Sequence, residues 1–208
     1  VYLDTATTAC AIAPIASASG GVVQMSVGAT DNHEAWLTSG GNAGVLGAIS
    51  DTAGSDKLTA FEARIQTSSI ADNVAAFFVG LAEEGLAAAD TKADDTGVFA
   101  DKDCIGFDVV QADGDAINFI YQKEGQTLQT LISGVQVPVA DTWYKFGFIY
   151  DPTADASKRI TIYVDNVEQS TYVTATQIAT ATFPDGEELA FLAGLKTGAA
   201  TAFNIKMD

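Results

Sequence analysis

Alternating apolar and polar positions dominate residues 142–166, TWYKFGFIYDPTADASKRITIYVDN. Successive side chains of a β-strand point to opposite faces, so each half of this region predicts a strand with one apolar face. The intervening DPTADASK is rich in turn-forming residues, and Asp165-Asn166 marks another turn. The pattern predicts an antiparallel hairpin whose inward positions are Tyr144, Phe146, Phe148 and Tyr150 in the first strand, and Ile160, Ile162 and Val164 in the second.

The same period of two recurs along most of the chain. It predicts further strands at 22–27, 35–38, 45–50, 58–66, 104–111, 116–123, 127–133, 167–174, 189–196 and 202–207. Segment 75–82, AAFFVGLA, is apolar at both parities. Its Ala and Leu content suits a helix, but Gly80 and the preceding strand favour a buried strand, followed by a helical turn at 83–89. Short strands at this spacing predict an all-β, two-sheet antiparallel sandwich.

The length of 208 residues fits one β domain. We expect the sandwich to occupy 22–208. Residues 1–21 are almost uncharged and fit either an edge strand or an extended arm that docks on a neighbouring chain. If they form an arm, its apolar side chains would contact the partner: Tyr2, Ile12, Pro14 and Ile15.

The charge balance restricts the possible partners. The chain has 27 acidic and 10 basic residues, a formal net charge of −17. Nucleic-acid binding needs a Lys/Arg surface, and anionic membranes repel a protein of this charge. The sequence therefore predicts neither a nucleic-acid ligand nor a membrane association, while docking on a basic protein stays compatible with it.

The thiols and the single imidazole offer little chemistry. Cys10 and Cys104 are the two cysteines, and they fit either buried thiols or one disulfide. His33 has no second histidine to complete a zinc site of the usual kind. We interpret His33 as a loop residue.

The order FEARI, AFFVGLAEE, hairpin, TWYKFGFIYD, ITIYVDN and LAFLAGLK resembles the concanavalin A-like (laminin-G/glucanase) jelly roll. More narrowly, DKLTAFEARIQTSSIADNVAAFFVGLAEE resembles a stretch of bacteriophage structural proteins with this fold. The resemblance covers roughly residues 57–208. It implies two curved antiparallel sheets packed face to face.

The same resemblance implies a non-enzymatic virion protein that decorates or stabilises the capsid exterior. Its partners would be the major capsid protein and further copies of this chain, and its place would be the capsid surface. The alternative that we keep open is a carbohydrate-binding module, displayed on a virion or not. A glycoside hydrolase is the third and weakest hypothesis.

Candidate acidic chemistry is sparse. Enzymes of this superfamily carry a Glu-x-Asp-x-(x)-Glu strand on a concave face, because retaining hydrolysis needs two carboxyls about 5–5.5 Å apart. No predicted strand has this pattern, since Asp113 and Asp115 lie in a turn and Glu83-Glu84 point apart. We therefore expect no catalytic residues and no obligatory cofactor. A structural Ca²⁺ would be held by the acidic loops 90–103, 113–115 or 151–155.

Four further side chains are candidates for binding. Glu62 and Arg64 share one strand face and indicate cross-strand ion pairs rather than a ligand site. Trp143 begins a strand and indicates packing. Trp36 lies in the polar stretch 30–44, which makes it the better sugar-stacking candidate.

Overall fold

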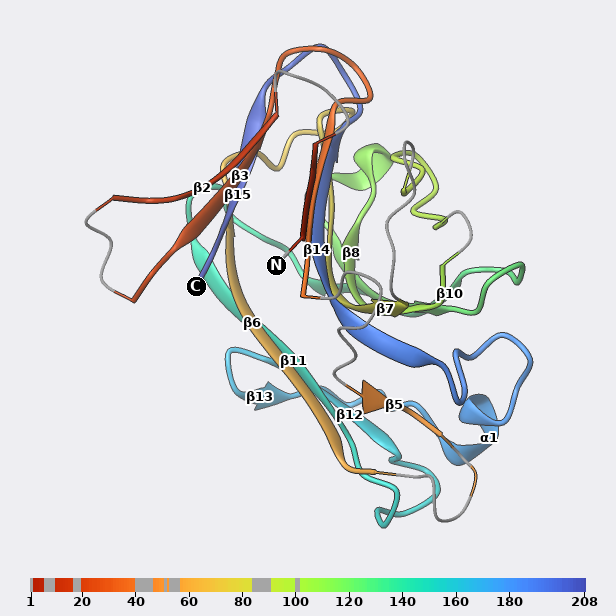
Figure 1. Cartoon of the computed structure of the whole chain (residues 1–208). Coiled ribbons are helices and arrows are strands. Elements are labelled where there is room, and N and C mark those ends of the chain that lie inside the picture. Colours follow the sequence, from red (N-terminus) through yellow and green to blue (C-terminus); the bar gives the residue numbers. More distant parts are fainter. Residues whose placement is uncertain are drawn as a thin grey trace.

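The computed structural model describes residues 2–5, 10–16, 20–39, 47–50, 52, 57–83, 91–99 and 102–208. Over these residues the chain is an all-β sandwich of an eight-stranded and a seven-stranded sheet. All strand pairs run antiparallel. Figure 1 shows the two layers, with β6 and β11 in one and β7 and β14 in the other. The predicted fold class is confirmed.

The first layer, sheet A, follows the order β1-β4-β14-β7-β8-β9-β10, and β5 also pairs with β14. Its strands are β1 (Tyr2–Thr5), β4 (Glu34–Thr38), β5 (Gly47–Ala48), β7 (Ala75–Glu83), β8 (Cys104–Val109), β9 (Ile117–Gln122), β10 (Gln129–Gln136) and β14 (Glu188–Thr197).

The second layer, sheet B, follows the order β13-β12-β11-β6-β15-β3-β2. Its strands are β2 (Ala11–Pro14), β3 (Val23–Val27), β6 (Thr59–Thr67), β11 (Trp143–Tyr150), β12 (Ile160–Val164), β13 (Val167–Glu168) and β15 (Phe203–Met207). The first two strands of the chain thus join different sheets: β1 is an edge of sheet A and β2 an edge of sheet B.

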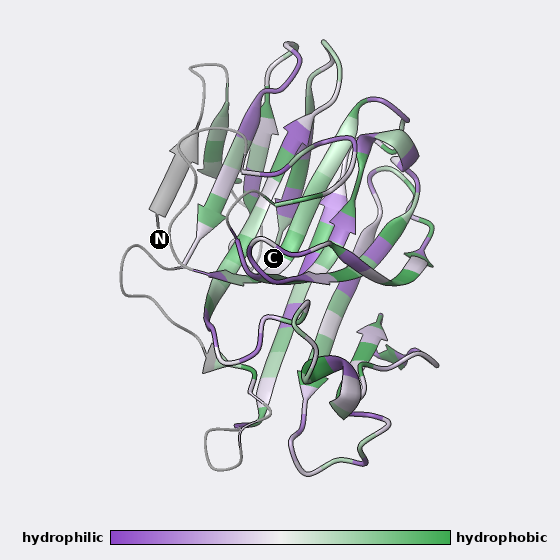
Figure 2. Ribbon diagram, turned by 90° about the vertical axis from the view of Figure 1, so that its right-hand side faces the viewer, coloured by the Kyte–Doolittle hydropathy of each residue, from purple (hydrophilic) through white to green (hydrophobic). Residues whose placement is uncertain are grey.

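The main core fills the space between the sheets, and hydropathy alternates along strands such as β6 (Figure 2). Phe61 stacks on Phe148 with ring centroids 5.3 Å apart, and Phe107 of sheet A lies 5.0 Å from Phe146 of sheet B. The inward parity of Phe146, Phe148 and Tyr150 is as predicted, because all three are at most 2% exposed. Aromatic packing of this kind dominates the burial of apolar area in such a core.

The outer face of sheet A is also covered. A second cluster of buried side chains lies on it, made of Trp36, Phe78, Ala82, Phe99, Cys104, Ile120 and Leu192. Residues 91–99, which we call the cover segment, contribute Phe99, whose backbone exchanges two hydrogen bonds with the Gln122 side chain. Both parities of β7 are therefore buried, as its doubly apolar sequence indicated.

Segment 75–82 is a strand, as predicted, within β7. The helical turn expected at 83–89 falls outside the described residues, except for Glu83, which ends β7. The strand expected at 167–174 is wrong beyond Glu168, since the chain turns into α1 (Ala175–Ile178). Thr174 and Gln177 form a capping box there, a helix-start signal that is visible in the sequence T-A-T-Q. In the described part of the chain, no helix has both the length and the apolar character needed to cross a membrane.

Candidate functional site

A groove crosses the outer face of sheet B where β6, β11 and β12 lie side by side. The cross-strand register aligns Glu62, Gly147 and Tyr163 in one row, and Ala60, Ile149 and Thr161 in the next. The groove has a volume of about 450 Å³, within the range of small-molecule sites. Its lining residues are Ala60, Phe61, Glu62, Lys145, Gly147, Phe148, Ile149, Tyr163 and Asn166.

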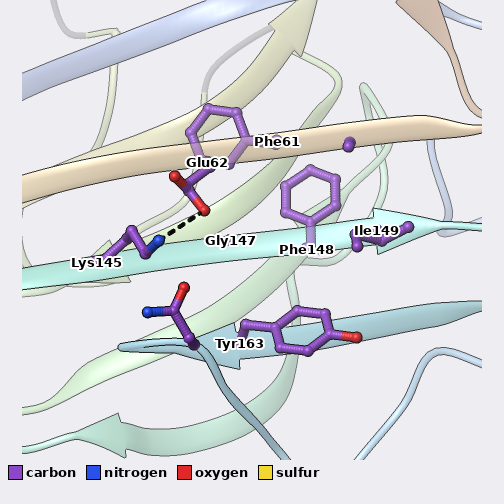
Figure 3. Close-up of a pocket in the computed structure, with 9 residues that line it drawn as sticks. Phe61, Glu62, Lys145, Gly147, Phe148, Ile149 and Tyr163 are labelled. Atoms are coloured by element: carbon purple, nitrogen blue, oxygen red, sulfur yellow. Dashed lines mark ion pairs between the residues drawn. The ribbon is translucent and has the colours of Figure 1, made fainter.

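Gly147 forms the floor of this groove. A Cβ atom at this position would lie 2.8 Å from the carbonyl oxygen of Phe61 on the neighbouring strand. The close approach of β6 therefore favours glycine here, and the missing side chain leaves a hollow between Glu62 and Tyr163 (Figure 3).

A tight turn places Asn166 at the end of the groove where Lys145 lies. Asp165 and Asn166 both have positive φ, at 48° and 66°, which a two-residue type I′ hairpin between β12 and β13 requires. The Asp165 carboxylate accepts a hydrogen bond from the Lys145 backbone at 2.8 Å, and the Asp165 backbone donates to the Lys145 carbonyl at 2.7 Å. The turn is thereby fixed against β11.

The polar end of the groove carries one ion pair. Lys145 Nζ lies 3.2 Å from Glu62 Oε2, and the two side chains are 30% and 64% exposed. Figure 3 shows this pair on one side of Gly147, with Tyr163 and Ile149 along the rest of the groove. Ile149 is 37% exposed and gives the opposite end an apolar surface.

This arrangement suits a ligand with one apolar and one hydrogen-bonding face. Tyr163 offers an aromatic surface, Glu62 accepts hydrogen bonds, Lys145 donates them, and the Asn166 amide can do both. Glu62 is the single carboxylate among the nine lining residues. The lining therefore offers the groups that stack on and hydrogen-bond to a polyol. Glycoside hydrolysis uses two carboxyl groups, of which the lining supplies one.

The expected ion pairs on this face are confirmed. Glu62 pairs with Lys145, and Arg64 pairs with Asp208 at 3.0 Å. The Arg64 guanidinium also lies 4.8 Å from the centre of the Trp143 ring, which fits the packing role predicted for Trp143.

The structure corrects the placement of Trp36. This residue lies in β4, in line with the strand predicted at 35–38, but it is 2% exposed rather than open to a ligand. Its indole Nε1 donates to Glu34 at 3.0 Å, and its ring packs edge-on against Phe99 at 6.0 Å. Polar neighbours in sequence suggested exposure, but the cover segment buries the ring, so Trp36 is not a surface platform for a sugar.

A buried ion pair holds the cover segment on sheet A. Lys92 Nζ lies 2.9 Å from Asp108 Oδ1 and donates to the Val109 carbonyl at 2.8 Å, and both charged side chains are at most 1% exposed. Burial raises the pKa of Asp108 against the opposing effect of Lys92. Gly97 lies directly over this carboxylate, since a Cβ there would be 2.6 Å from Asp108 Oδ2.

The two cysteines form no disulfide, which leaves the thiol alternative. Cys104 is buried in the second cluster on sheet A, and burial raises its pKa well above the ordinary thiol value. A thiol with a raised pKa is a poor nucleophile, so Cys104 is a packing residue.

Of the acidic loops considered for Ca²⁺, the 113–115 loop is the one whose carboxylates cluster in the described part of the structure. Asp113 and Asp115 meet Asp72, with one carboxylate oxygen of each within 4.8 Å of the others, and all three are exposed. A hydrogen bond with Asp115 raises the pKa of Asp113. Asp151 and Asp155 instead accept hydrogen bonds from Thr153 and Ser157 in their own turn. Ca²⁺ takes six to eight oxygen ligands, and exposed acidic clusters are common in acidic proteins, so this cluster by itself assigns no metal site.

The residues predicted for partner contact lie at the edges of both sheets, Tyr2 in β1 of sheet A and the other three in or next to β2 of sheet B. Ile12 is half-buried against the main core, while Pro14 is exposed at the end of β2. The backbone of Ile15 donates to the Val22 carbonyl at 2.8 Å. The side chain of Tyr2, in β1, lies outside the described part of the structure. Within that part, the segment forms edge strands of the sandwich.

Comparisons with known proteins agree with this fold. Neither a protein-family model nor a curated protein matches the sequence. The endo-β-1,4-glucuronan lyase of the fungus Trichoderma reesei matches 100% of this chain and 87% of its own, with a TM-score of 0.63 and 10% identity. A family 16 endo-glucanase from Bacteroides ovatus matches 94% of this chain and 82% of its own, with a TM-score of 0.56 and 12% identity.

The potassium-bound carbohydrate recognition domain of Emp46p matches 96% of this chain and 87% of its own, with a TM-score of 0.54 and 11% identity. Identities this low show the fold alone. The chain has the concanavalin A-like jelly-roll fold that occurs in carbohydrate-active and carbohydrate-recognising proteins, as the sequence resemblance implied.

Sequence reasoning missed the groove itself. Tyr163 and Lys145 were placed on their strands, but their meeting over Gly147 depends on the register of three strands. The signals that could have indicated it are a glycine inside a strongly aromatic strand and the Asp-Asn turn that follows Tyr163.

Proposed function

We propose that this protein is a non-catalytic carbohydrate-binding β-sandwich whose groove over Gly147 receives the glycan. The observation that carries the proposal is the position of Tyr163 across an uncovered glycine floor from the Glu62–Lys145 ion pair. A sugar ring has an apolar C–H face and a hydroxyl rim, which match the aromatic and polar sides of this groove.

Three further observations support the proposal. In the described part of the chain, Trp36, Phe78 and Phe99 fill part of the outer face of sheet A, whereas the groove lies on the outer face of sheet B. Glycoside hydrolysis uses two carboxyl groups about 5–9.5 Å apart, and the lining of the groove supplies Glu62 alone. The three solved structures of similar fold are described as acting on or recognising carbohydrate.

The test is binding to a glycan array, followed by calorimetry on the sugars retained. We expect Tyr163→Ala to weaken binding at least tenfold. Tyr172→Ala removes another partly exposed tyrosine, one that bonds Glu168, and should bind like the wild type. A wild-type protein that retains no glycan, or a Tyr163→Ala variant with unchanged affinity, would refute the proposal.

A second candidate is a structural role in a virion, with the capsid exterior as its place and the major capsid protein and further copies of this chain as partners. The edge strand β2 favours it, because Ala11, Ala13 and Pro14 are exposed there. An edge strand can accept a strand from another protein. Ala13→Arg should reduce the copies bound per purified particle, and unchanged occupancy would remove β2 from such an interface.

A further inference from the structure

We propose that the groove recognises a neutral sugar through two adjacent hydroxyl groups and discriminates against acidic sugars. This inference rests on the proposed function and names the ligand class and the residues that select it. The selecting residues are Glu62, Lys145 and Asn166, at the polar end of the groove.

The first argument is the pairing of donor and acceptor. Lys145 Nζ and Glu62 Oε2 are 3.2 Å apart, and both remain partly exposed. An ionised carboxylate only accepts hydrogen bonds and an ammonium group only donates them. Two neighbouring hydroxyls of one sugar ring can form both hydrogen bonds at once, one by donating to Glu62 and the other by accepting from Lys145. Such a ligand binds with the ion pair intact.

The second argument is that two cations at the polar end of the groove are ion-paired. Lys145 pairs with Glu62, and Arg64 pairs with Asp208 at 3.0 Å. A sugar carboxylate would have to displace Glu62 and would then lie next to its displaced charge. Displacing Glu62 would give up the attraction within this partly exposed pair and bring two like charges together, whereas a neutral diol does neither.

The third argument is the field of the whole protein. The net charge of −17 repels a polyanion over distances of about 10 Å at moderate salt. A neutral glycan experiences no such repulsion, so its affinity should change little with salt concentration.

The other end of the groove fits the apolar side of a sugar chain. Ile149, which lines this end, is 37% exposed and gives it an apolar surface. Lys145 and Ile149 are four positions apart on an extended strand, a span of about 14 Å. This length exceeds one pyranose ring, so the groove is suited to an oligosaccharide rather than a monosaccharide.

The experiment compares two matched sets of oligosaccharides by isothermal titration calorimetry. The neutral set is cellotetraose, laminaritetraose and mannotetraose, and the acidic set is tetragalacturonate and a glucuronan oligomer, each at low and at high NaCl. We expect at least one neutral ligand to bind at least tenfold tighter than either acidic one, with little dependence on salt.

Three variants locate the selectivity. Glu62→Gln keeps the size of the side chain but releases Lys145, so it should weaken neutral binding several-fold and strengthen uronate binding. Asn166→Gly removes the amide but keeps a residue that adopts the positive φ of this turn, so it should weaken neutral binding alone. Lys158→Met removes a cation that pairs with Glu168, and it should change neither selectivity nor affinity.

The outcomes separate the two proposals. Preference for the acidic set, lost in Tyr163→Ala, would overturn this inference and leave the groove as a carbohydrate site. Neutral binding that is indifferent to Glu62→Gln and Asn166→Gly would also overturn it. Binding of either set that survives Tyr163→Ala, or no binding at all, would overturn the proposed function itself.

Discussion

Lys92 Nζ lies 2.9 Å from Asp108 Oδ1, and the two side chains are 0% and 1% exposed. This ion pair joins the cover segment to β8 on the outer face of sheet A, beneath Gly97. Charges buried this deeply are tolerated only as a pair, because each alone would carry a large desolvation cost.

The first prediction concerns the breaking of this pair. Lys92→Met and Asp108→Leu should each lower the free energy of unfolding by about 3–5 kcal/mol, because each leaves a buried charge without its partner. The double variant should be less destabilised than either single variant. Denaturant unfolding followed by tryptophan fluorescence measures all three.

The control for this cycle is the exposed pair of Lys158 and Glu168, whose side chains are 50% and 47% exposed. Its single variants should cost less than about 1 kcal/mol. If Lys92→Met costs no more than Lys158→Met, the buried pair does not anchor the cover segment.

The second prediction concerns pH. Burial raises the pKa of Asp108 in the folded protein above its unfolded value, so the folded state binds this proton more tightly. The contribution of Asp108 to the free energy of unfolding is therefore largest below the ordinary Asp range near pH 4 and falls as pH rises through the raised pKa. The free energy of unfolding of the wild type minus that of the Lys92→Met/Asp108→Leu double variant should therefore decrease as pH rises through the raised pKa.

Other carboxylates do not obscure this difference. Hydrogen bonds from Thr153 and Ser157 lower the pKa values of Asp151 and Asp155, which gives the opposite pH trend. Both proteins contain these turns, so their contributions cancel in the subtraction. A stability difference that rises with pH would contradict the raised pKa of Asp108.

The third prediction tests the packing of Trp36 on β14. A Cβ at Gly194 would overlap the Trp36 ring, so Gly194→Ala must displace the indole. We expect a loss of roughly 1–3 kcal/mol in the free energy of unfolding and a changed near-ultraviolet circular dichroism spectrum. A Trp143→Phe background leaves Trp36 as the sole tryptophan.

Gly186→Ala is the comparison for this variant. Gly186 has φ +75° and nothing within 4 Å of the added Cβ, so the change introduces backbone strain without a clash. It should destabilise the protein while leaving the Trp36 spectrum unchanged. An unaltered spectrum in Gly194→Ala would contradict the contact.

The fourth prediction concerns thiol reactivity. Cys104 is 0% exposed and burial raises its pKa, so native protein should not be alkylated there by iodoacetamide at mildly alkaline pH. Adding denaturant should expose it, as peptide mass spectrometry would detect. Rapid native labelling of Cys104 would show that the second cluster opens readily.

Period-two patterning was enough to place most strands and the main core, because Phe146, Phe148 and Tyr150 obey a simple alternation. It could not reveal the covering of sheet A. The sequence AAFFVGLA indicates burial on both faces without identifying what covers them, and Trp36 lies within the largely polar stretch 30–44. Predicting the groove requires the strand register as well as the strand positions, because Glu62 and Tyr163 are aligned only through the pairing of their strands with β11.

The division of the first residues between two sheets has a practical consequence. Because β1 closes one sheet at β4 and β2 closes the other at β3, truncating this region would bare two new strand edges at once. Shortened protein would then tend to self-associate, and a loss of any interaction after such a deletion would reflect aggregation as readily as a missing contact. Point substitutions on β2 that keep the backbone in place are the sounder way to ask what this end of the chain touches.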